Sequence, residues 1–108
     1  MKYTPPTRET GMEIAKAFKA TLLNNNIPVL EVRLFGSLAQ GNTHEWSDID
    51  IAVIHKPFSQ SIMQERRAIR RLHKERRFPV DILCFHPEDL ENKLLGVAQE
   101  VKKHGIVI

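Results

Sequence analysis

Residues 34–51 of the chain have the sequence LFGSLAQGNTHEWSDIDI, and this stretch decides which fold the chain can form. An apolar run ends at Phe35, a glycine and a serine follow, and the chain later continues as aspartate alternating with isoleucine. The apolar run at 27–35 and the alternation at 48–54 are both typical of β-strands, in which successive side chains point to opposite faces. The sequence therefore predicts two strands connected by a Gly-Ser turn and a polar loop.

The segments on either side of this stretch predict helices around a small sheet. Apolar residues recur with helical spacing between Pro5-Pro6 and the asparagines at 24–26, which predicts a first amphipathic helix. Three further elements are expected: a helix at 59–77, a strand at 79–85 and a helix at 87–104. Residues 106–108 either add a short edge strand or dock against the domain. This order predicts an α/β (α+β) fold, a small mixed sheet packed by helices in two layers.

Length and composition narrow the class of protein. The 108 residues suffice for one core and not for two, so residues 1–108 are expected to form a single domain. With 42% hydrophobic and 27% charged residues, the chain has enough apolar material to fold. It has neither a signal core nor an apolar run of roughly 20 residues, so we expect no membrane association and a cytoplasmic protein. The net charge of +3 suits anionic partners without choosing among them.

Asp48 and Asp50 are candidate metal ligands. Two residues apart on one strand, they project to the same face, while Ile49 and Ile51 project to the other. Carboxylates with ordinary pKa values near 4 would repel each other there at neutral pH, unless a hard divalent cation lies between them. Magnesium fits best, because it binds one or two carboxylates together with substrate phosphate oxygens.

Gly36 and Ser37 are candidate phosphate-binding residues. A glycine lets the backbone approach a ligand closely, and Ser37 offers a hydroxyl and an N–H at the start of a short helical turn. A third carboxylate, Asp81, lies between apolar neighbours in the strand at 79–85. If this strand lies beside the one at 48–54, Asp81 joins the other two aspartates in a site for one or two metal ions.

Each part of this pattern also has an ordinary structural explanation. A Gly-Ser turn alone is a common connection, and an Asp-x-Asp pair alone is common at a loop or on a solvated strand face. Together and in this order, with Asp48 eleven residues after Ser37, the parts favour one site for nucleotidyl transfer. That reaction needs a bound triphosphate, metal ions and a carboxylate near the attacking hydroxyl.

At these residues the chain resembles the nucleotidyltransferase superfamily related to DNA polymerase beta, and most closely its minimal nucleotidyltransferase (MNT) branch. There, a Gly-Ser pair and a short spacer precede Asp-x-Asp, and the resemblance covers nearly the whole chain. It implies the polymerase beta-like fold, with Gly36 and Ser37 holding the triphosphate of ATP. It further implies that Asp48 and Asp50 bind one or two Mg²⁺ ions and that Asp81 is the third catalytic carboxylate.

The resemblance also implies a partner. Members of the branch are frequently antitoxins paired with a HEPN-domain ribonuclease toxin, and some transfer AMP from ATP to a tyrosine of that toxin. Larger relatives carry a separate acceptor-binding domain, and none fits in this chain, so the acceptor surface is expected from a partner or a second copy. Two hypotheses follow: an enzyme that transfers AMP from Mg-ATP to a hydroxyl of a partner protein, or a non-catalytic antitoxin that neutralises its partner by occlusion.

One residue departs from the pattern of the branch. An arginine often follows the alanine of the Gly-Ser turn, whereas this chain has Gln40 after Ala39. Glutamine cannot make the charge-assisted phosphate contact of an arginine, although no metal ligand is lost. This difference favours the occlusion hypothesis.

Several other residues are expected to have no role in catalysis. The helix at 59–77 is strongly basic, yet it lacks interleaved aromatic residues, so a solvated face is favoured over an RNA contact. His44 and Trp46 either touch a base or anchor the loop between the two motifs. The single cysteine, Cys84, is expected to be a small buried hydrophobe. The remaining histidines show no metal-ligand spacing, and none is assigned to zinc: His55, His73, His86 and His104.

Overall fold

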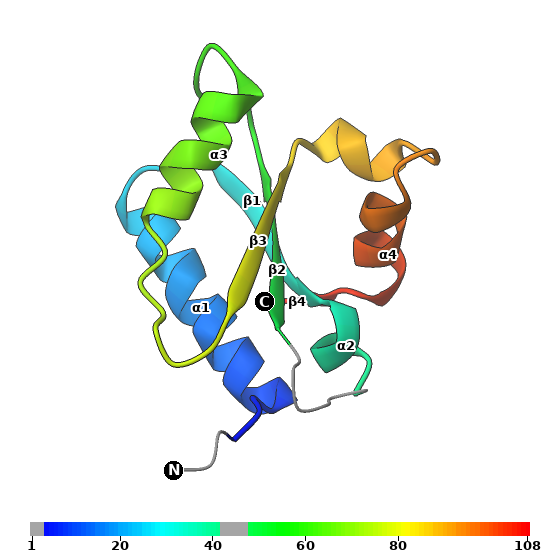
Figure 1. The fold of residues 1–108 in the computed structure, drawn as a ribbon. Coiled ribbons are helices and arrows are strands. Elements are labelled where there is room, and N and C mark those ends of the chain that lie inside the picture. Colours follow the sequence, from blue (N-terminus) through cyan, green and yellow to red (C-terminus); the bar gives the residue numbers. More distant parts are fainter. Residues whose placement is uncertain (1–3, 42–47) are drawn as a thin grey trace.

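A four-stranded sheet lies between helices in the structure, a computed structural model that describes residues 4–41 and 48–108 (Figure 1). Along the chain the elements are α1 (Arg8–Asn24), β1 (Val29–Phe35), α2 (Gly36–Ala39), β2 (Ile49–His55), α3 (Ile62–Arg71), β3 (Val80–Phe85), the 3-10 helix η1 (Pro87–Glu91), α4 (Gly96–His104) and β4 (Ile106–Val107). The strand order is β3-β2-β1-β4. His44 and Trp46 lie outside the described residues.

The sheet is mixed, as the sequence predicts. β1 runs antiparallel to both β2 and β4, whereas β2 and β3 are parallel. Parallel neighbours need a crossover connection, and α3 provides it between β2 and β3. β4 pairs with the end of β1. Of the two predictions for residues 106–108, a short edge strand or docking against the domain, the structure shows the edge strand. The mixed α/β fold with a small sheet is confirmed.

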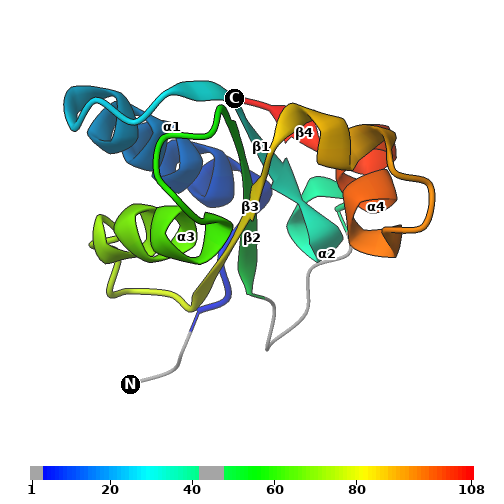
Figure 2. The ribbon, with the colours of Figure 1, turned by 90° about the horizontal axis from the view of Figure 1, so that it is seen from above.

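Helices cover both faces of the sheet, so the expectation of two layers is wrong. α1 and α3 lie on one side and α4 on the other, as the views from the front and from above agree (Figures 1 and 2). Because side chains alternate along β2, Ile51 packs towards α1 and α3, whereas Ala52 and Ile54 pack against Ala98 and Val101 of α4. The apolar stripe of α4 is buried only on this second face, which produces a third layer.

The predicted helix at 59–77 is shorter in the structure, because α3 ends at Arg71. The side chain of Glu75 accepts hydrogen bonds from the backbone N–H of Arg77 at 2.7 Å and from its Nε at 3.0 Å. Such local bonds compete with helical ones. Pro79 further disfavours helical backbone at the preceding Phe78.

The predicted helix at 87–104 is divided into η1 and α4. At the break, the side-chain oxygen of Asn92 accepts a hydrogen bond from the backbone N–H of Leu94 at 3.0 Å, which favours a turn. Leu94, which follows the break, is 93% exposed and contributes nothing to the core. None of the described helices is both long enough and apolar enough to cross a bilayer.

Cys84 is the small buried hydrophobe that the sequence predicts. Its side chain lies in the core beneath α3 and is 2% exposed. Burial raises the pKa of the thiol to about 11, which keeps it protonated and unreactive at neutral pH.

Burial along β1 predicts how much two alanine substitutions should lower the free energy of unfolding. Leu34→Ala removes a fully buried side chain and should lower the free energy of unfolding by about 3 kcal/mol. Leu30→Ala, on the same strand but 49% exposed, should cost less than about 1 kcal/mol. Urea denaturation followed by circular dichroism measures both, and equal losses would contradict the packing described.

Candidate functional site

The three candidate aspartates meet at one edge of the sheet, where β1 ends and β2 and β3 begin. In the strand register, Asp50 lies opposite Phe35 of β1 and opposite Asp81 of β3. The sequence analysis predicts that Asp81 joins the other two aspartates if these two strands are neighbours, and the structure shows that they are. Gly36 follows Phe35 directly, so the Gly-Ser turn begins at the same edge.

The aspartates differ in exposure. Asp50 is half-buried, whereas Asp81 is exposed and Asp48, just before β2, is exposed too. Ile49 and Ile51 point towards α1 and α3, and side chains alternate along the strand. Asp50 therefore belongs to the other face of the sheet, which α4 covers, and Asp48 and Asp81 share this alternation. The half-buried carboxylate is thus flanked by two solvent-accessible ones.

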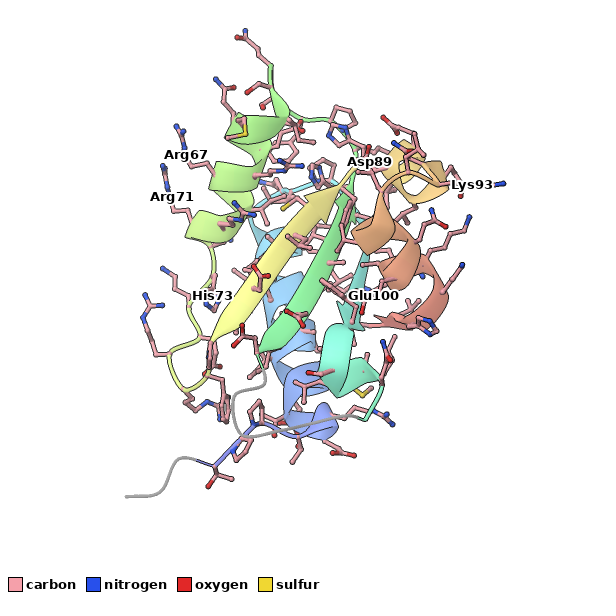
Figure 3. All side chains as sticks on the ribbon, turned by 45° about the vertical axis from the view of Figure 1, so that its right-hand side comes forward. Arg67, Arg71, His73, Asp89, Lys93 and Glu100 are labelled. Carbon is pink, nitrogen blue, oxygen red and sulfur yellow. The ribbon has the colours of Figure 1, made fainter. Side chains whose placement is uncertain are left out.

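Crowding of negative charge changes the acidity of Asp50. Burial raises the pKa of this carboxyl to about 6, and the charges of Asp81, Asp48 and Glu100 add to the rise. Glu100, a half-buried residue of α4, was missed by the sequence analysis (Figure 3). No local pattern marks it, because only the packing of α4 on this face brings it near. The cluster suits a cation, which would relieve the repulsion.

Glycine is required at position 36 by Asp50. Gly36 has a φ of +75°, a backbone conformation that side chains disfavour. A Cβ atom there would lie 2.1 Å from Oδ2 of Asp50, far inside van der Waals contact. The carboxylate of Asp50 is therefore in close approach to the backbone of the turn. Ser37, the next residue, is half-buried in α2.

α1 holds α2 in place through Arg8. The guanidinium donates hydrogen bonds from Nε to the carbonyl oxygen of Leu38 at 3.3 Å and from Nη2 to that of Ala39 at 3.0 Å. These carbonyls end the short helix, and that of Leu38 also accepts a hydrogen bond from the backbone N–H of Gly41 at 3.2 Å. Gln40, which departs from the MNT pattern, is exposed directly after them. No local pattern marks Arg8, because it lies 30 and 31 residues from its two acceptors.

The basic helix contributes at least one arginine to the structure of the sheet. Arg70 donates from Nε and Nη2 to the carbonyl oxygen of Ile82 on the edge strand β3, at 3.2 and 3.0 Å. Arg67 and Arg71 point away from the sheet and are exposed (Figure 3). The solvated face favoured by the sequence agrees with their placement.

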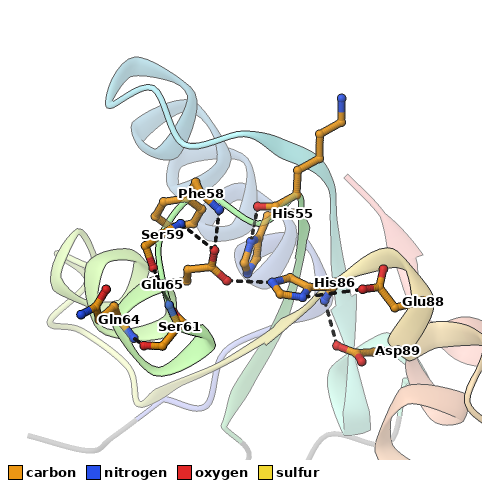
Figure 4. Close-up of polar contacts among 10 residues, drawn as sticks. His55, Phe58, Ser59, Ser61, Gln64, Glu65, His86, Glu88 and Asp89 are labelled. Carbon is orange, nitrogen blue, oxygen red and sulfur yellow. Dashed lines mark hydrogen bonds and ion pairs between the residues drawn. The ribbon is translucent and has the colours of Figure 1, made fainter.

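Two of the histidines that seemed scattered in the sequence come together in space. His55 ends β2 and His86 follows β3, so parallel pairing places both at the end of the sheet remote from the aspartates. Glu65 of α3 lies between them (Figure 4). Separations of 10 and 21 residues along the chain carry no recognisable ligand spacing, which is why the sequence did not reveal the group.

Comparisons with known proteins agree with this architecture. A protein from Sulfolobus solfataricus that carries the provisional name nucleotidyltransferase matches with a TM-score of 0.67 and 19% identity, over 93% of this chain and 80% of that one. A toxin-antitoxin structure with AMP-PNP matches with a TM-score of 0.55 and 25% identity, over 86% of this chain and 70% of that one. A tyrosine-to-alanine variant of the toxin-antitoxin MntA-HpeT gives the same TM-score and identity, with 69% of that chain covered.

No curated protein matches the chain. The family model described as "Nucleotidyltransferase domain", however, matches residues 12–108. This match covers nearly all of α1 and every later element of the fold. The chain therefore belongs to the nucleotidyltransferase domain family.

Proposed function

We propose that the chain transfers AMP from Mg-ATP to a hydroxyl of a partner protein. The observation that carries the proposal is the register of β2 and β3, which sets Asp50 and Asp81 side by side next to the Gly36 turn. Family membership supports a transferase that acts on a nucleotide. The exposed Asp48 and Asp81 leave the site open on the side from which an acceptor would approach.

The donor set fits magnesium. Asp48, Asp50 and Asp81 offer only carboxylate oxygens, the ligands that Mg²⁺ prefers, and burial together with the charges of neighbouring carboxylates raises the pKa of Asp50. These three residues would hold one or two ions. When bound, magnesium neutralises charge on the triphosphate and polarises the attacked phosphorus.

Other groups of the protein would bind the phosphates, orient the acceptor hydroxyl and accept its proton. The backbone at Gly36 and Ser37 would hold the phosphates, since the missing side chain at Gly36 leaves room for a close approach. Asp81, exposed at the start of β3, would orient the acceptor hydroxyl and accept its proton as AMP is transferred and pyrophosphate leaves. Arg8 would act indirectly, by fixing the end of α2.

We further propose that the acceptor belongs to a toxin of the HEPN type and that this chain is its antitoxin. Support comes from the two toxin-antitoxin structures that share the fold at 25% identity, one of which contains AMP-PNP. The second candidate is an antitoxin that acts by occlusion alone. One observation favours it: Gln40 is exposed beside the proposed phosphate site and brings no positive charge there.

Calorimetric titration with a nonhydrolysable ATP analogue separates the two functions. The wild-type protein should bind the analogue only with Mg²⁺, and Asp48→Asn or Asp50→Asn should weaken binding at least about 10-fold, because each removes a proposed metal ligand. Glu9→Gln, which alters an exposed acid on α1, is the matched control and should bind normally. Binding that is indifferent to Mg²⁺ and to both aspartates would rule out the catalytic proposal.

A pair of glycine substitutions tests the close approach. Gly36→Ala should lower the free energy of unfolding by about 2 kcal/mol or more, through its left-handed backbone and the collision with Asp50, and should abolish binding of the Mg²⁺ complex. Gly96→Ala meets no atom within 4 Å and should leave both quantities unchanged. Thermal unfolding and the same titration provide the readouts. Normal nucleotide binding by a folded Gly36→Ala protein would refute the placement of the phosphates.

The pKa of Asp50 predicts a pH-dependent stability of the metal-free protein. Its folded value of about 6 lies above the ordinary 3.8, so the folded state binds the proton more tightly. The wild-type protein therefore loses stability as the pH rises from about 4 to about 6. Asp50→Asn should be equally stable at pH 4 and about 1–2 kcal/mol more stable at pH 8, less than the full shift because solvent reaches the carboxyl. Urea denaturation in EDTA measures this difference, and a constant difference across pH would contradict it.

A further inference from the structure

A second cluster of metal-ligating side chains lies at the opposite end of β2 from the aspartates. His55, Glu65 and His86 come from β2, α3 and the segment after β3, and one ligand atom of each lies within 4.8 Å of the others (Figure 4). The rings of the two histidines are 5.1 Å apart between centroids and almost perpendicular, at 85°. His55 is 0% and Glu65 is 1% exposed, so the cluster is part of the interior.

One atom in this cluster has no partner. Among residues 4–41 and 48–108, Nε2 of His55 is the single buried side-chain nitrogen or oxygen without a hydrogen bond. Its other ring nitrogen, Nδ1, is 3.0 Å from the carbonyl oxygen of Lys56 and so carries the proton that it donates. Nε2 is then an unprotonated lone pair, directed away from that carbonyl and ready to bind a cation.

The other two members of the cluster are bonded to each other. Nε2 of His86 is 2.7 Å from Oε1 of Glu65, while its Nδ1 is 3.8 Å from a carboxylate oxygen of Glu88. Oε2 of Glu65 accepts hydrogen bonds from the backbone N–H groups of Phe58 and Ser59. In His55 and Glu65, the polar atom that is not the candidate ligand is thus held by the backbone, the arrangement that orients ligands around metals.

A carboxylate and a neutral imidazole are the forms that coordinate metals, so binding of an ion would release the proton that joins Nε2 of His86 to Oε1 of Glu65.

We propose that His55, Glu65 and His86 bind a divalent transition-metal ion, Zn²⁺, through Nε2 of each histidine and a carboxylate oxygen of the glutamate. Imidazole nitrogens favour zinc over magnesium, so this site differs in metal as well as in place from the aspartate cluster. Ligand distances of about 2.1 Å in a tetrahedral site separate the ligand atoms by about 3.4 Å, a spacing that falls within the observed range. The side chain of His86 is 17% exposed and provides the route of entry.

The proposed ion would join three elements that are distant in sequence. It would link the end of β2, the first turns of α3 and the start of η1. Three protein ligands leave one tetrahedral position for water or for a group of another molecule. We infer a role in stability, because the site lies at the far end of the sheet from the aspartates.

Titration with Co²⁺ and Zn²⁺ tests the proposal. After chelation and dialysis, the protein is titrated with Co²⁺ in excess Mg²⁺, which occupies the aspartate cluster, and visible absorption reports tetrahedral coordination. One equivalent should bind, and Zn²⁺ should displace it. Zn²⁺ at about 100 times its Kd should also raise the Tm by about 10 °C.

Single substitutions locate the ion. His55→Gln, His86→Gln and Glu65→Gln should each lower Zn²⁺ affinity by at least about 10- to 100-fold, the loss that even an outer-shell change produces. His104→Gln changes an exposed histidine of α4 and should bind as the wild type does. If His55→Gln does not fold by circular dichroism, the more exposed His86→Gln decides. Absence of binding by the folded wild-type protein would leave an ordinary His86–Glu65 ion pair and overturn the proposal, as would full binding by His86→Gln.

Discussion

The close approach of the Asp50 carboxylate to the backbone of Gly36 is the constraint on which the arrangement of the three aspartates depends. It ties the end of β1 to the start of β2 at a distance that permits no side chain between them. Position 36 must be glycine for two reasons, the positive φ and the neighbouring oxygen, and both arise from the same turn. The Gly-Ser turn and the aspartates are thereby brought to one place by a local backbone feature.

The alternation of side chains along β2 separates its isoleucines from its aspartates. Its isoleucines at 49 and 51 enter the core, so the aspartates at 48 and 50 must face the other way. Hydrophobic burial on one face therefore fixes the direction of the carboxylates on the other. A one-residue slip of β2 would turn the carboxylates towards the core beneath α1 and α3 and the isoleucines towards α4, an arrangement that the packing strongly disfavours.

Sequence reasoning predicts where residues lie when the determining contacts are local. Gly36, Asp48 and Asp50 fall within one stretch, and strand periodicity alone relates them. The placement of Asp81 beside Asp50 could be predicted only on condition that two strands were neighbours, since strand order depends on the crossover. Glu100 could not be found, because its relation to Asp50 depends on how α4 packs against the sheet. The third layer of helices escaped prediction for the same reason.

The helix α3 links the end of β2, where His55 lies, to the start of β3, where Asp81 lies. This helix is the crossover between β2 and β3, so its position determines how β3 is set beside β2. Glu65 is a buried acid on an otherwise basic helix, and burying its charge is tolerable only where His86 and the backbone N–H groups of Phe58 and Ser59 receive it. That requirement fixes the start of α3 against the far end of the sheet. The polar cluster at His55 thus helps to hold the register that places Asp81 beside Asp50.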